Sequence, residues 1–183
     1  MLKNAATMML ALILSASTAA AAQERKDLQI FRDISNQVNR YTQFTIFDNV
    51  EASVMQGRVV LTGAVTMPFK KTDIERRVRE VAGVTEIDNR IEVLPVSQFD
   101  DELRFRIARA IYSNSAFWNY AAMANPPIHI VVNRGRVTLA GVVQNNVERM
   151  LARSLATGFA SFEVNNELKT DEEAQAELER IGS

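Results

Sequence analysis

The residues that most suggest chemistry are three aromatic side chains in the second half of the chain, directly after a predicted helix that bears three arginines. Tryptophan and tyrosine favour the membrane–water interface, where an apolar ring and a polar edge are both accommodated. Arginines beside them add about 1 kcal/mol each against anionic headgroups. Our candidates for contact with an anionic phospholipid surface are therefore Phe117, Trp118, Tyr120, Arg104, Arg106 and Arg109.

The alternative for this aromatic segment is a structural role. In that case Phe117 and Trp118 fold back to cap a small hydrophobic core, or fill the space between two halves of the molecule. Trp118 is the only tryptophan, so its fluorescence distinguishes a packed ring from an exposed one without any label.

The rest of the chain offers little for catalysis. There are no cysteines, which excludes a thiol nucleophile, a disulfide and a cysteine metal site. His129 is the only histidine and lies in a predicted strand, where we interpret it as an ordinary sheet residue. No carboxylate pair and no glycine-rich phosphate loop stands out. We predict no catalytic residue, no cofactor and no metal site, and therefore a protein that is not an enzyme.

The charge distribution limits the classes of partner that the protein can bind. A formal net charge of −1 argues against non-specific nucleic-acid binding, which needs a basic field. The net charge is 0 over residues 26–95, +2 over residues 100–169 and −4 over residues 170–183. The last range begins with a capping-box sequence at Thr170, so we expect an acidic C-terminal tail with a short, solvated helix.

The N-terminus has the three parts of a secretory signal peptide. Lys3 supplies a positive charge, a short apolar run follows, and Ala20-Ala21-Ala22 offers an exit for the peptidase. The apolar run is shorter than the roughly 20 residues that span a bilayer. We expect residues 1–22 to be removed and the mature protein to be soluble in the periplasm, without a lipid anchor.

The chain repeats itself. Residues 54–65 and 132–143 both contain Gly-Arg-Val-x-Leu-x-Gly-x-Val, at a spacing of 78 residues from Gly57 to Gly135. Such fixed-spacing similarity indicates a duplicated unit. An x-Gly pair between two alternating runs is typical of a tight hairpin, because glycine accepts a positive φ. We assign turn and strand geometry, not ligand binding, to Gly57, Gly63, Gly135 and Gly141.

Each copy has the predicted order αββαβ. In the second copy, Leu103, Ile107 and Ile111 recur on one helix face, and Asp100 or Asp101 is the expected N-cap. The expected apolar face of its second helix is Val147, Met150, Leu151 and Leu155, and Phe162 is placed in its last strand.

Only one face of each predicted sheet is apolar. We therefore predict an α+β protein of two tandem units, each a three-stranded mixed sheet with two helices on one face. The other face would meet water or a partner and carries Glu51, Ser53, Arg58, Thr62, His129, Arg136 and Thr138.

This order, the Gly-x-Val-x-Leu-x-Gly hairpin strand and the closing Val/Ile-x-Asn-x-Ile/Leu strand resemble the BON domain, over residues 26–95 and 100–169. The tandem arrangement behind a signal peptide is similar to the osmotically inducible periplasmic proteins. The resemblance implies attachment to phospholipid membranes, or a periplasmic interaction module, in envelope or osmotic stress. Our leading prediction is an envelope protein at membrane surfaces, and the alternative is a protein-interaction scaffold that uses the exposed sheet faces. Self-association stays open.

Overall fold

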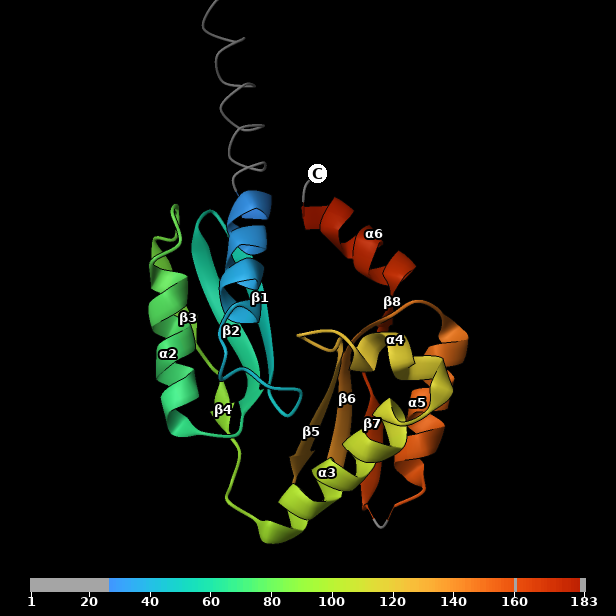
Figure 1. The fold of residues 1–183 in the computed structure, drawn as a ribbon. Coiled ribbons are helices and arrows are strands. Elements are labelled where there is room, and N and C mark those ends of the chain that lie inside the picture. The colour runs from blue at the N-terminus through green and yellow to red at the C-terminus, as the bar shows by residue number, and fades with distance from the viewer. Residues whose placement is uncertain (1–26, 160, 182–183) are drawn as a thin grey trace, which may run out of the picture.

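The computed structural model describes residues 27–159 and 161–181, so the predicted signal peptide lies outside the described residues. Unit one consists of a first helix over residues 27–39, followed by β1 (Asn49–Met55), β2 (Arg58–Val65), α2 (Pro68–Arg79), β3 (Glu86–Asn89) and β4 (Glu92–Val93). Unit two consists of α3 (Gln98–Tyr112), η1 (Ser115–Phe117), α4 (Trp118–Ala121), β5 (Ile128–Asn133), β6 (Arg136–Val143), α5 (Asn146–Thr157), β7 (Glu163–Asn166) and β8 (Lys169–Thr170). A last helix, α6, spans Asp171–Ile181 (Figure 1).

The α+β class and the two repeated units are confirmed. In unit one, β2 is the central strand, antiparallel to β1 and parallel to β3 and β4. Unit two repeats this arrangement around β6. The closing strand of each unit runs in two pieces that both pair with the central strand, which is why four strands stand where three were predicted.

Both helices of a unit cover the same sheet face. The core of unit one joins Ile30 and Ile34 of the first helix and Ile74 of α2 to Val59 and Leu61 of β2. The core of unit two joins the equivalent positions of α3, α5 and the central hairpin. Burial of these aliphatic side chains is the main favourable term in units that have no disulfide.

Each hairpin turn is held by an aspartate at the start of the preceding helix. Gln56 and Gly57 have φ values of 55° and 76°, as a type I′ turn requires. The Asp27 carboxylate accepts hydrogen bonds from both of their amides, at 2.7 and 3.0 Å. In unit two, Asp100 does the same for Arg134 and Gly135, at 2.8 Å each.

The prediction of Asp100 or Asp101 as an N-cap was therefore wrong. The cap of α3 is Ser97, whose hydroxyl accepts from the Asp100 amide at 3.2 Å. Asp100 is buried because the turn amides, not the helix end, are its partners.

The predicted apolar face of α5 was partly wrong. Val147 and Met150 are 77% and 53% exposed, whereas Ala152 and Ala156 are fully buried. Tyr120 from the longer connection of unit two lies against the first turn of α5 and contacts Glu148, so this turn presents a glutamate inward instead of Val147. Phe162, which was predicted to lie in the last strand, instead precedes β7 and is exposed.

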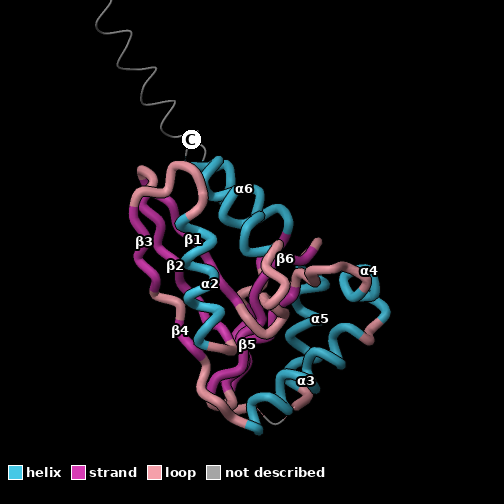
Figure 2. The backbone as a smooth tube through the Cα atoms, turned by 60° about the vertical axis from the view of Figure 1, so that its left-hand side comes forward, coloured by secondary structure: helices cyan, strands magenta, loops and turns pink. Residues whose placement is uncertain are grey.

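The two units meet through residues 44–48 of unit one. The carbonyl of Ile46 accepts from the Ile130 amide at 2.6 Å, and the ring of Phe47 packs edge-on against Phe105 at 4.8 Å. Helices α3 and α5 lie on the far side of the second sheet, so its other face is turned toward unit one (Figure 2). This segment is the docking element between the units.

Candidate functional site

The outer face of α3 is the best-defined candidate surface. Leu103, Ile107 and Ile111 are buried, which fixes the opposite side of the helix toward solvent. The spacing of three or four residues places Phe99, Glu102, Arg106 and Arg109 on that side in one stripe. The indole nitrogen of Trp118 donates to the Ser113 carbonyl at 3.3 Å, which holds the ring at the C-terminal end of the helix. We call these five residues the outer stripe.

The outer stripe combines aromatic ends with a basic middle. Phe99 and Trp118 are 54% and 63% exposed. The Arg106 guanidinium lies over the ring of Phe159 at 5.3 Å and forms only a long, exposed pair with Glu102, at 3.8 Å. Within residues 27–159 and 161–181, no ion pair engages Arg109. Both cations are therefore open to an anionic partner.

Half of the predicted contact residues are not accessible. Phe117 is completely buried in the core of unit two, and Tyr120, 6% exposed, stacks against it at a ring distance of 6.0 Å. Arg104 is 5% exposed. As a correction to the sequence-based assignment, these three side chains cannot touch a membrane in this structure, whereas Trp118, Arg106 and Arg109 are exposed. The core-capping alternative, which was made for Phe117 and Trp118, holds for Phe117 but not for Trp118.

Tyr120 is buried because it completes a polar network. Its hydroxyl donates to the Glu148 carboxylate at 2.6 Å and accepts from the Gln144 amide at 3.0 Å. Burial, with the bond to Glu148, raises the pKa of Tyr120 to about 12. The positions 78 residues earlier, Thr66 and Lys70, both donate to Asp48 instead. One site in the fold is thus filled by tyrosine and glutamate in unit two and by aspartate and lysine in unit one.

Arg104 is buried because it closes a strand edge. Its Nη2 donates to the carbonyl of Val132 at 3.1 Å, and its Nη1 pairs with Asp101 at 2.9 Å. The guanidinium therefore serves the sheet and is not available to a ligand.

Sequence reasoning missed a second aromatic contribution. Phe162 is 84% exposed, and its ring lies directly over the hairpin turn, within 2.7 Å of where a Cβ on Gly135 would stand. Phe99 approaches the same point at 3.5 Å. These two rings lie together at the hairpin turn, at the Phe99 end of the outer stripe. The sequence shows an aromatic residue at position 162, but the alternating pattern of the last strand led to its assignment to the sheet.

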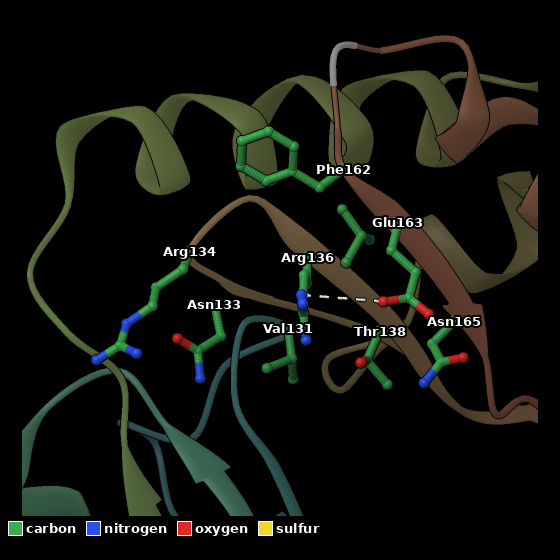
Figure 3. Close-up of a pocket in the computed structure, with 9 residues that line it drawn as sticks. Val131, Asn133, Arg134, Arg136, Thr138, Phe162, Glu163 and Asn165 are labelled. Atoms are coloured by element: carbon green, nitrogen blue, oxygen red, sulfur yellow. Dashed lines mark ion pairs between the residues drawn. The ribbon is translucent and has the colours of Figure 1, made fainter.

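The open face of the second sheet forms a shallow groove of about 790 Å³ (Figure 3). Arg136 pairs loosely with Glu163 across it, at 3.9 Å, and the buried Oδ1 of Asn133 has no hydrogen-bond partner. The remaining labelled side chains of the groove are Val131, Arg134, Thr138, Phe162 and Asn165. This set supplies hydrogen-bonding and apolar contacts but no nucleophile with an adjacent base.

The polar sheet faces differ in exposure. Glu51, Ser53, Arg58, Thr62 and Arg136 are exposed, and Thr138 is half-buried. His129 instead meets unit one: its Nδ1 lies 2.6 Å from the Asp48 carbonyl and its ring 5.4 Å from that of Phe44. Burial lowers the pKa of His129, partly opposed by the carbonyls of Asp48 and Thr45. The histidine therefore belongs to the contact between units.

The described residues contain neither a candidate membrane span nor a candidate metal-ligand cluster. None of their helices has the length and apolar content to cross a bilayer. Nor do they bring three histidine or acidic side chains together as a metal site would require.

Comparison with solved structures gives distant likenesses. The C-terminal domain of CdsD, a structural protein of the type III secretion system of Chlamydia trachomatis, aligns with a TM-score of 0.31 and 12% identity, over 76% of this chain and 64% of that one. A second structure of CdsD aligns with a TM-score of 0.30 and 13% identity, over 82% of this chain and 97% of that one. No curated protein matches the sequence.

The family comparison is specific. The model of the BON domain matches twice, over residues 26–95 and residues 100–172. These ranges contain the hairpin glycines, both αββαβ units except the first two residues of α3, and the outer stripe except Phe99. The chain therefore belongs to the BON domain family, as a tandem of two such domains.

Proposed function

We propose that this protein is exported to the periplasm and associates there with the surface of anionic phospholipid membranes through the outer stripe of α3. BON domains are non-catalytic and are linked to membrane and phospholipid interaction. The predicted signal peptide supports export. The observation that carries the proposal is the stripe itself, in which exposed aromatic rings flank two available arginines.

The geometry of α3 suits a helix that lies flat on a membrane. Its 15 residues extend over about 22 Å, with Phe99 at one end and Trp118 at the other. Rings at both ends enter the headgroup region while Arg106 and Arg109 face anionic phosphates. Phe162, beside Phe99, adds a third exposed ring at the same end.

The test is a titration of the protein with anionic vesicles, with zwitterionic vesicles as the control and Trp118 fluorescence as the readout. We expect a blue shift with anionic lipid that is lost at high salt, because exposed charges are screened. The double variant Arg106→Glu/Arg109→Glu should weaken binding at least about tenfold. The matched control is Arg76→Glu/Arg79→Glu, the same charge change on the exposed side of α2.

Two results would contradict the proposal. One is no vesicle binding by the wild-type protein at low salt. The other is equal loss of binding in both double variants, because that would assign the effect to net charge and not to α3. Export is tested separately, by cell fractionation and by sequencing the mature N-terminus, which should begin after Ala22.

The scaffold alternative draws support from the groove on the second sheet, whose Asn133 Oδ1 is buried and unpaired. It requires a protein partner bound by the wild-type protein and lost on Arg136→Glu, with vesicle binding unchanged.

A further inference from the structure

The equivalent edge strands of the two sheets, β1 and β5, differ in whether their outward backbone groups are hydrogen-bonded. In unit two, the outer edge of β5 is closed at three successive outward-facing residues. The Tyr112 hydroxyl donates to the Ile128 carbonyl at 2.6 Å and accepts from its amide at 3.2 Å. At the next two outward-facing residues, the Ile130 amide donates to the Ile46 carbonyl, and the Val132 carbonyl accepts from the Arg104 side chain. An edge closed in this way cannot add another strand.

The outer edge of β1 in unit one is open. The register with β2 pairs Val50 with Gly63, Ala52 with Leu61 and Val54 with Val59, so the amides and carbonyls of these β1 residues point away from β2. No hydrogen bond between described residues reaches them on that side.

The difference follows from two helix positions. The hairpin-holding aspartates and the core residues align the first helix with α3 at an offset of 73, which matches Phe31 to Arg104 and Asn39 to Tyr112. Phenylalanine has no donor, and the Asn39 side chain makes no bond to β1. Unit one therefore lacks both caps that close β5.

A groove runs along this open edge. Two cavities of about 280 and 340 Å³ share Phe31, Glu51, Ala52 and Glu177 in their linings, so they adjoin. The first helix and β1 line one side, and unit two with α6 lines the other. The core-facing side chains of the edge are only half-buried, whereas their equivalents Ile128, Ile130 and Val132 are fully buried.

The charge of the groove favours a basic occupant. Its linings contain three carboxylates, Glu51, Glu167 and Glu177, and two cations, Lys169 and Arg180. Arg180 already has an interaction partner. Lys169 is committed to Glu177, whereas Glu51 and Glu167 have no ion-pair partner in the described part of the chain. An incoming segment would thus meet apolar side chains on one face and acidic groups at the rim.

We propose that the outer edge of β1 binds an extended, basic segment of a partner protein, which adds to the first sheet as a further strand. Backbone hydrogen bonds to Ala52 and Val54 supply affinity, apolar side chains at alternate positions pack toward Phe31, and basic side chains face Glu51. The strand edge that binds the segment belongs to unit one, and the site is independent of the outer stripe.

The probe is a short fluorescein-labelled peptide in which valine and lysine alternate, and the control peptide has glutamate in place of lysine. By fluorescence anisotropy, the full chain should bind the lysine peptide at least about tenfold more tightly. Glu51→Lys should remove that preference. In amide exchange measured by NMR, Val50, Ala52 and Val54 should exchange rapidly in the free protein and become protected with peptide.

Two variants test the edge directly. Ala52→Pro removes an outward amide without touching the β1–β2 ladder, and Asn39→Tyr introduces the cap that Tyr112 supplies in unit two. Each should weaken peptide binding at least about tenfold and leave vesicle binding unchanged. The proposal is overturned if the wild-type protein does not bind the lysine peptide, or if both variants bind it as the wild type does.

Discussion

The side chains that decide this structure at the residue scale are buried polar groups with fixed partners. Asp48 is fully buried, and Lys70, 5% exposed, pairs with it at 2.7 Å. Burial alone would raise the pKa of Asp48, but the hydrogen bonds from Lys70, Thr66 and Thr45 outweigh it and lower the pKa. The carboxylate therefore stays ionised inside unit one and ties the start of β1 to the start of α2.

Removing Lys70 should cost far more than removing a surface cation of the same helix. Lys70→Met leaves the buried Asp48 carboxylate without its counter-charge, and we expect a loss of about 3–5 kcal/mol in the free energy of unfolding. Arg76→Met breaks the exposed pair with Asp73 and should cost less than about 1 kcal/mol. Urea denaturation of both variants makes the comparison. Equal losses in the free energy of unfolding would show that the buried pair stabilises the protein no more than the exposed one.

At the element scale, the central strands depend on one glycine each. Gly63 and Gly141 have φ values of 104° and 110°. A Cβ on Gly63 would collide with the backbone of Asn49 in β1, and one on Gly141 with that of Pro127, directly before β5. These residues let β2 and β6 pass close to the start of their hairpin partners. The repeated Gly-x-Val-x-Leu-x-Gly pattern thus marks a packing requirement of the sheet.

Gly141→Ala should destabilise the protein by more than about 2 kcal/mol, because it adds a positive-φ penalty to a backbone collision. The matched variant is Gly158→Ala at the end of α5. Gly158 has a negative φ, and its added Cβ would meet only the Leu155 carbonyl, at an ordinary 3.5 Å. We expect that variant to unfold within about 1 kcal/mol of the wild type. Thermal melts that rank the two variants in the opposite order would refute this assignment.

Local signals explain how much of the fold was predictable. The x-Gly turns and the four-residue spacing in the first helices are set by neighbours in the sequence, so αββαβ could be read twice. The burial of Phe117, Tyr120 and Arg104 could not be predicted in this way. Tyr120 bonds to Glu148 and Arg104 bonds to Val132, and both partners come from other elements. The outer stripe was half predictable: arginine and tryptophan suggested a membrane surface, but helix phase decided which of them face solvent.

At the scale of the whole molecule, two small cores share one contact. Besides the Ile46 and Phe47 contacts, Asn125 donates to the Asn39 carbonyl at 2.7 Å and His129 reaches the Asp48 carbonyl. The helix α6 extends this contact, because Glu177 and Ile181 lie across the β1 groove from Glu51. Its prediction as a solvated appendage was therefore incomplete: one side of α6 is half-buried.

The contact between units should weaken in mild acid. Burial lowers the pKa of His129 from its ordinary 6.5, so the docked state favours the neutral ring. Its stabilisation is complete above pH 6.5 and is lost as the pH falls below it. The charged groups that line the cavity beside the ring are Glu51, Glu167, Lys169 and Glu177.

As the only histidine, His129 gives one NMR titration curve, whose midpoint should lie below 6.5. The melting temperature of the wild type should also fall more steeply between pH 7 and pH 5 than that of His129→Asn, which keeps a donor but cannot titrate. A midpoint at or above 6.5 would show that burial does not lower the pKa of His129 and would contradict this pH dependence.

The docking segment 44–48 has no counterpart in unit two. There the longer connection folds into α4, and its Phe117 and Tyr120 pack in the core of their own unit. The contact is therefore heterologous: the donor surface is in one repeat and the acceptor in the other. Once formed within a chain it leaves neither half free for a second molecule. Two chains could share this contact only by exchanging units, and residues 95–98 would then be the hinge of a domain-swapped dimer.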